Sequence, residues 1–196
     1  ISGTCQNLYL KNLHIEKVIA GIECKHVTGG YLKDTYISCD WNLLAKENGS
    51  HCVYMGGITK NYHFKNLTLL NAGDGGGIKR SYEILDAEDI SENLIFENII
   101  IDNCDIAVQI GRRTHNSIFK NIIATNVLKF GLEFFGAENI IVSNCSFKGS
   151  ADGSCGIGIN SYSDDTAYVR NVKIANCNFD FYRKIFFVGS SRQRTD

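Results

Sequence analysis

The chain has 196 residues, with 20 Lys and Arg against 21 Asp and Glu, so its formal net charge is −1. This balance lacks the basic excess of a nucleic-acid-binding protein, and the 44 % hydrophobic content is typical of a folded chain rather than a disordered one. No apolar run approaches the roughly 20 residues that span a bilayer, and no signal peptide is visible in the chain.

Three residue counts point to the architecture: the chain has no Pro, 19 Asn and 24 Ile. Ile favours strands and Asn favours turns, so a chain rich in both must alternate short strands with turns. The missing Pro fits this interpretation, because a strand with neighbours on both sides cannot spare a backbone N–H. The length predicts one domain, residues 1–196.

A sequence motif with two polar positions five residues apart recurs along the chain. Clear copies begin at Asn7, Asn61, Asn93, Asn116, Asn139 and Asn171, and a weaker copy begins at Gly30. The second polar position falls at Asn12, Asp34, Asn66, Asn98, Asn121, Asn144 and Asn176. These positions recur every 22–23 residues, or every 32 where an insertion falls within 45–60, 73–92 or 148–168. Insertions at a constant place in a repeat indicate loops on one face.

Apolar residues alternate on both sides of the second polar position, which predicts a short strand on each side and a bend between them. A further apolar run follows in most copies, at residues 19–24, 41–44, 52–55, 106–110, 130–134, 156–159 and 185–188. This period predicts an all-β, single-stranded parallel β-helix, a solenoid of about seven to eight coils with loop insertions on one face. Stacked Asn side chains would hydrogen-bond along the axis and satisfy amides that an apolar interior penalises.

With this period and its Asn ladder, the chain resembles the right-handed parallel β-helix superfamily of pectate-lyase-like enzymes, polygalacturonase-like glycoside hydrolases and bacteriophage tailspikes. The resemblance covers essentially the whole chain. It implies a right-handed coil and a bacterial or plant polysaccharide as partner, and the tailspikes imply a homotrimer. Neither end of the chain shows a polar cap, so we expect a fragment of a longer protein.

Two clusters in the first half are candidates for the polysaccharide site. His51 and Tyr54 would bind and stack on a sugar, although a regular strand would put them on opposite faces and a turn His beside a core Tyr is the alternative. In the Gly-rich segment that follows, Asp74, Lys79 and Arg80 are candidate catalytic residues. The cations can neutralise a uronic-acid carboxylate, and the resemblance implies Arg as the base of a lyase. The alternative is a glycine-rich turn with a solvated basic pair.

Two further clusters lie in the second half. Arg112, Arg113 and His115 would bind an acidic glycan along the same edge as Lys79 and Arg80, or form a solvated turn. The other cluster is acidic and is a candidate for hydrolysis, in which two carboxyls lie about 5–5.5 Å or 6.5–9.5 Å apart. Its candidate catalytic residues are Glu133, Asp164 and Asp165, and Asn160 is a candidate substrate-binding residue. No Asn-x-Asp precedes the Asp pair at one-coil spacing, which departs from the polygalacturonase pattern. No cofactor or metal is expected, and Ca²⁺ has no supporting ligand spacing.

The eight Cys include no CxxC motif and do not form a disulfide pattern. Cys145 and Cys177 occupy the slot after the ladder Asn where other copies have Leu or Ile, which predicts buried free thiols. This usage suits folding in a reducing compartment, where phage proteins assemble. The first hypothesis is therefore a polysaccharide-binding and degrading module of a phage tailspike or receptor-binding protein, located on a virion or outside the cell. The alternatives are a secreted polysaccharide lyase or glycoside hydrolase, and a non-catalytic stalk.

Overall fold

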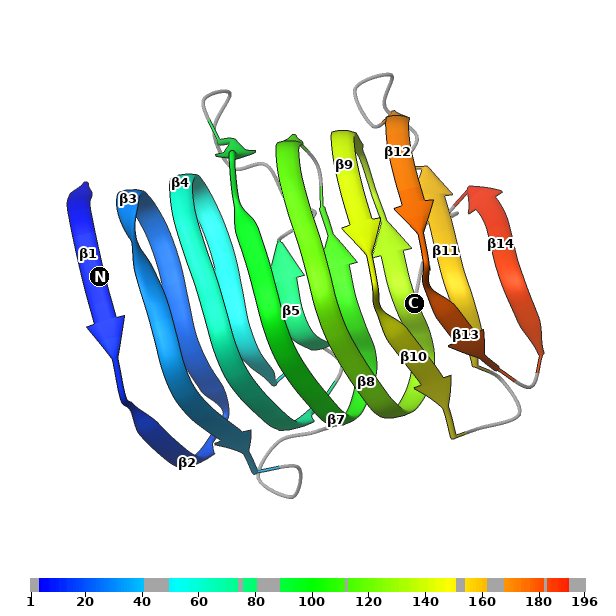
Figure 1. Cartoon of the computed structure of the whole chain (residues 1–196), viewed down its shortest axis with the longest axis horizontal. Coiled ribbons are helices and arrows are strands. Elements are labelled where there is room, and N and C mark those ends of the chain that lie inside the picture. Colours follow the sequence, from blue (N-terminus) through cyan, green and yellow to red (C-terminus); the bar gives the residue numbers. More distant parts are fainter. Residues whose placement is uncertain are drawn as a thin grey trace, which may run out of the picture.

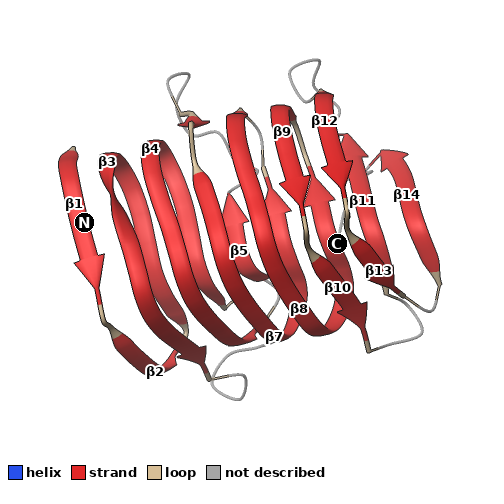
Figure 2. Ribbon diagram, viewed as in Figure 1, coloured by secondary structure: helices blue, strands red, loops and turns tan. Residues whose placement is uncertain are grey.

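The computed structural model describes residues 4–40, 50–73, 76–80, 89–111, 113–150, 154–161, 168–181 and 183–190. These ranges contain strands and no helix, which confirms the all-β prediction (Figure 2). The described part of the chain accordingly has no helix that could span a membrane. All strands belong to one 14-stranded sheet. They are β1 (Cys5–Lys11), β2 (His14–Val18), β3 (Ala20–Cys39), β4 (His51–Ala72), β5 (Gly76–Arg80), β6 (Ser91–Glu92), β7 (Ile95–Ile110), β8 (Thr114–Phe134), β9 (Ala137–Ser143), β10 (Ser146–Gly149), β11 (Cys155–Ser161), β12 (Val169–Ala175), β13 (Asn178–Asp180) and β14 (Lys184–Ser190).

Equivalent residues of successive repeats are neighbours in the sheet, and the strands pair in parallel. Leu32 on β3 pairs with Phe64 on β4, Phe64 pairs with Phe96 on β7, and Phe96 pairs with Phe119 on β8. Figure 1 shows the same order in space, because the chain passes steadily from β1 at one end of the molecule to β14 at the other. The period seen in the sequence is therefore the step from one strand to its parallel neighbour.

The long strands bend where the sequence has Asn in a left-handed backbone conformation. Asn66 and Asn98 have φ of 54° and 56°, in the middle of β4 and β7. Most L-residues avoid this conformation, whereas Asn tolerates it. A further set of Asn residues with φ of 54–58° lies five residues later, and our sequence analysis did not identify it: Asn71, Asn103 and Asn126.

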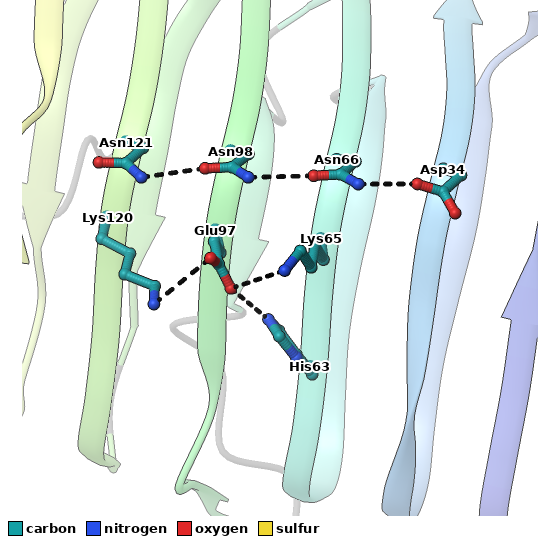
Figure 3. A network of polar contacts seen from close by, with 8 residues as sticks. All are labelled: Asp34, His63, Lys65, Asn66, Glu97, Asn98, Lys120 and Asn121. Carbon is teal, nitrogen blue, oxygen red and sulfur yellow. Dashed lines mark hydrogen bonds and ion pairs between the residues drawn. The ribbon is translucent and has the colours of Figure 1, made fainter.

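Three Asn side chains and one Asp at these bends form a hydrogen-bonded ladder across β3, β4, β7 and β8 (Figure 3). The Asn66 amide donates to Asp34 at 2.8 Å, the Asn98 amide donates to Asn66 at 3.1 Å, and the Asn121 amide donates to Asn98 at 3.0 Å. These side chains are exposed, which differs from the expectation that they satisfy amides in an apolar interior. The left-handed residue turns its side chain outward, so the ladder runs along the surface and the apolar residues on either side fill the core.

The interior contains a column of aromatic rings. The Phe64 and Phe96 rings are parallel to within 1° with centroids 4.5 Å apart, and the Phe96 and Phe119 rings are parallel to within 4° at 4.6 Å. All three residues are at most 2 % exposed. Because the three residues occupy the same register position, parallel pairing places their rings face to face, and the column fixes the stacking of β4, β7 and β8.

Substitution of Asn98 tests the role of the bend. Asn98→Ala is expected to reduce the free energy of unfolding by about 2 kcal/mol, because Ala, unlike Asn, is disfavoured in the left-handed conformation by about 1–2 kcal/mol and the ladder bonds are lost. Asn98→Gly loses the same ladder bonds but tolerates the positive φ, so it should lose less. Urea unfolding of both variants makes the comparison. A glycine variant at least as unstable as the alanine variant would contradict a conformational role for Asn98.

Glu97 lies beside the ladder at the centre of an ionic network (Figure 3). Its carboxylate is 3.0 Å from His63 Nε2, 3.5 Å from Lys65 Nζ and 3.4 Å from Lys120 Nζ. Burial acts to raise the pKa of Glu97, but Lys120, Lys65 and His63 outweigh it and hold the pKa below its ordinary value. A carboxyl with a lowered folded-state pKa stabilises the fold above its unfolded pKa, and this contribution disappears as the pH falls through the folded-state pKa.

The network therefore predicts acid sensitivity that depends on Glu97. Wild-type stability should fall as the pH drops below about 4.3, the ordinary Glu value. Glu97→Gln removes the titrating group, so its stability should be lower near pH 7 and should change less in this acid range. Thermal unfolding followed by circular dichroism at several pH values measures both curves. Parallel curves for the two proteins would show that Glu97 does not contribute to the acid dependence.

Candidate functional site

Five residues at one register position form a polar row across adjacent strands, and we call them the polar row. Glu23 on β3 pairs with Tyr54 on β4, Tyr54 with Lys79 on β5, Lys79 with Gln109 on β7, and Gln109 with Glu133 on β8. In four of these strands the preceding residue is fully buried in the core: Val53, Ile78, Val108 and Leu132. Because side chains alternate along a strand, the polar row projects away from the core.

Glu133 is the centre of a buried hydrogen-bonded cluster at one end of the polar row. Gln109 Nε2 donates to one carboxylate oxygen at 2.7 Å, and Asn160 Nδ2 of β11 donates to the other at 2.8 Å. Gln109, Glu133 and Asn160 are 5 %, 4 % and 9 % exposed. Within the described residues, Gln109 Oε1 is buried without a hydrogen-bond partner. The cluster therefore fixes a carboxylate and leaves an acceptor oxygen beside it.

The structure brings Glu133 and Asn160 together from two repeats, as candidates of the same predicted acidic set. Gln109 completes the cluster and was missed by the sequence analysis. Its signal was visible, because Gln109 is the one polar residue in the apolar run 106–110. The sequence pattern predicts a short apolar strand here, and the fourth residue of that strand faces outward in the polar row.

His51 and Tyr54 lie on the same face, which differs from the opposite-face geometry of a regular strand. Their ring centroids are 4.7 Å apart, with an angle of 32° between the planes. The cause is a change of phase between them, since Cys52 and Val53 are both fully buried. Two consecutive inward residues mark a bend, and this bend returns the next side chain to the face of His51.

Glu23 connects this aromatic pair to the end of the polar row. Its carboxylate oxygens lie 3.3 Å from His51 Nε2 and 3.1 Å from Lys25 Nζ. The Lys25 ammonium is also 5.7 Å from the centre of the Tyr54 ring. Burial acts to raise the pKa of Glu23, and Lys25 and His51 outweigh it to give a lowered pKa. Glu23 therefore remains ionised and holds the imidazole beside Tyr54.

The predicted basic residues are distributed over two places. Lys79 is in the polar row, between Tyr54 and Gln109. The backbone of Arg80 ends β5, but its side chain lies outside the described residues. Arg113 precedes β8, and His115 pairs with Glu92 and Glu138 on strands outside the polar row. The other candidates lie outside the described residues: Asp74, Arg112, Asp164 and Asp165.

The polar row offers groups for proton transfer and for binding an anion. Its phenol, ammonium and carboxamide stand on neighbouring strands about 4.8 Å apart, with the His51 imidazole beside the phenol and the Asn160 amide bound to Glu133. Its two carboxylates, Glu23 and Glu133, are separated by four strand steps, on the order of 19 Å. That separation exceeds the roughly 9.5 Å upper limit for a glycosidase pair, so these two cannot serve as one. No group of three or more His, Cys, Asp or Glu that could hold a metal ion occurs among the described residues.

Comparison with known proteins supports the fold. Neither a protein-family model nor a curated protein sequence matches this chain. An alginate lyase from Paenibacillus sp. str. FPU-7 has a similar structure, with a TM-score of 0.56 and 9 % sequence identity over 91 % of this chain and 77 % of that chain. A candidate glycosyl hydrolase from Parabacteroides merdae aligns over 95 % of this chain and 80 % of that chain, at 10 % identity and a TM-score of only 0.25.

Proposed function

We propose that the chain is a right-handed parallel β-helix that binds an acidic polysaccharide and cleaves it by β-elimination. The parallel register between repeats supports the β-helix. The strong preference of parallel crossovers for the right hand supports its handedness. This proposal develops the secreted-lyase alternative rather than the tailspike hypothesis, since a solved structure with a similar fold is an alginate lyase.

The proposed activity rests on the position of Lys79 in the polar row, between Tyr54 and Gln109. An ammonium at this position would neutralise the carboxylate of a uronic acid, which makes the adjacent C5 proton easier to remove. The Gln109 amide would bind a neighbouring sugar hydroxyl or carboxylate. The polar row spans on the order of 19 Å, which is enough for several sugars.

The remaining groups account for the proton balance of the elimination. A base takes the proton from C5, the C4–O bond breaks, the leaving oxygen takes up a proton, and a C4–C5 double bond forms. The Tyr54 phenol and the neighbouring His51 imidazole supply the groups that exchange these protons, with Glu23 orienting the imidazole. No second carboxyl is needed for this reaction.

The nature of the product tests the proposal. The full chain should be incubated separately with alginate, pectate and a neutral glucan of similar length. We expect ultraviolet absorbance from the new conjugated double bond with at least one acidic polymer and none with the neutral glucan. New reducing ends without that absorbance would indicate hydrolysis and contradict the lyase proposal. Binding on a glycan array without cleavage would contradict catalysis, and the absence of both would contradict polysaccharide recognition.

A further inference from the structure

Two cysteines from successive repeats meet in the core at the edge of an insertion. Cys39 ends β3 and Cys52 follows the first residue of β4, and their sulfur atoms are 3.7 Å apart. Cys39 is 3 % exposed and Cys52 is fully buried. The Cys52 sulfur also lies 3.5 Å from the Leu70 carbonyl oxygen. The two thiols are therefore in contact, although their places in the sequence gave no pairing signal.

Cys39 also lines a polar cavity of about 510 Å³. Two carboxylates, Glu16 and Asp40, and one ammonium, Lys17, contribute to the lining. The charged residues of the lining therefore have a net charge of −1, which favours binding of a cationic ligand over an anionic one. Cys52 lies behind Cys39 as seen from this cavity, since it is fully buried and does not line it.

We propose that Cys39 and Cys52 form a thiol–disulfide exchange site that accepts a small, positively charged disulfide from the cavity. This inference does not rest on the proposed polysaccharide activity. The Cys39 thiolate attacks one sulfur of the reagent, which forms a mixed disulfide and releases a first thiol. The first sulfur leaves as a thiolate and takes the Cys52 proton, and Cys52 then attacks the Cys39 sulfur, which forms the Cys39–Cys52 bond and releases the second thiol. The protein dithiol is oxidised and the reagent disulfide is reduced.

The order of these steps follows from the environments of the two thiols. A hydrogen bond from the Cys52 thiol lowers the pKa of Cys39 against the opposing effect of burial. The same hydrogen bond, together with burial, raises the pKa of Cys52. Cys39 lines the cavity and Cys52 is fully buried behind it, so Cys39 reacts first and Cys52 resolves the mixed disulfide.

The experiment uses the full chain, reduced and then freed of reductant. It is treated with cystamine, which is cationic, with the neutral bis(2-hydroxyethyl) disulfide, or with oxidised glutathione, which is anionic. Rates are normalised to the reaction of each reagent with a free small thiol. We expect intact mass to fall by two hydrogens, a peptide map to link Cys39 with Cys52, and cystamine to react several-fold faster than glutathione. The bond should raise the melting temperature by about 5 °C or more.

Single variants distinguish the attacking and resolving thiols. Cys52→Ser should stop at a mixed disulfide on Cys39, Cys39→Ser should leave Cys52 unmodified, and the matched control Cys155→Ser should behave as wild type. If either variant fails to fold, the wild-type peptide map decides alone. Free Cys39 and Cys52 after treatment, or a bond between Cys145 and Cys177 in their place, would overturn the proposal. A normalised rate for glutathione that equals or exceeds that for cystamine would overturn entry through the cavity.

Discussion

Replacing Phe96 by alanine is expected to reduce the free energy of unfolding by about 3–5 kcal/mol. Phe96 is fully buried and lies between Phe64 and Phe119, with ring centroids 4.5 and 4.6 Å away. The substitution removes the burial of one ring, breaks two face-to-face contacts and leaves a cavity between two repeats. Because each repeat packs chiefly on its neighbours, the substitution weakens the packing between β4, β7 and β8.

Urea unfolding measures this loss, and a residue on the same strand provides the control. Ile100 lies on β7 with its side chain 51 % exposed, so Ile100→Ala should change the free energy of unfolding by less than about 0.5 kcal/mol. If Phe96→Ala changes the slope of the unfolding free energy against urea concentration as well as lowering the midpoint, the repeats unfold separately. Equal stabilities of the two variants would contradict the aromatic column as the main contact between these repeats.

Much of the fold could be predicted because Asn is the residue that most often adopts the left-handed conformation at the bends. Asn66 and Asn98 adopt positive φ at the bends, and the apolar residues beside them alternate into the core. The sequence therefore carried both the period and the position of the bends. The further bends at Asn71 and Asn103 follow the same rule, but they were not identified because only some copies have Asn there.

The candidate site was less predictable, because it depends on register between repeats of unequal length. Gln109 and Glu133 are 24 residues apart and Glu133 and Asn160 are 27 apart, so neither contact falls on the 22–23-residue period. The contact between His51 and Tyr54 needs the phase change at two consecutive buried residues, which simple alternation does not predict. Local pattern thus gives the strands, whereas the site needs the pairing between them.

Replacing Tyr54 by phenylalanine is expected to reduce kcat on an acidic polysaccharide by about 100-fold or more, because a positioned proton-transfer group contributes roughly 10²–10⁴-fold. The variant keeps the ring beside His51 and removes only the hydroxyl, so KM and stability should change little. Tyr31→Phe is the matched control, since Tyr31 lies on β3 outside the polar row, with the Lys33 ammonium 4.3 Å from its ring centre.

The pH profile separates chemistry from binding in the same variants. If Tyr54 exchanges the proton, Tyr54→Phe should change the shape of the kcat profile against pH, while Tyr31→Phe keeps the wild-type profile. Initial rates of double-bond formation at saturating substrate measure both. An equal fall in kcat for the two variants would indicate a general packing effect. A wild-type kcat in Tyr54→Phe would show that Tyr54 takes no part in the chemistry. The elimination would then depend on His51 and Lys79, so the lyase proposal would stand and the proton path through Tyr54 would be wrong.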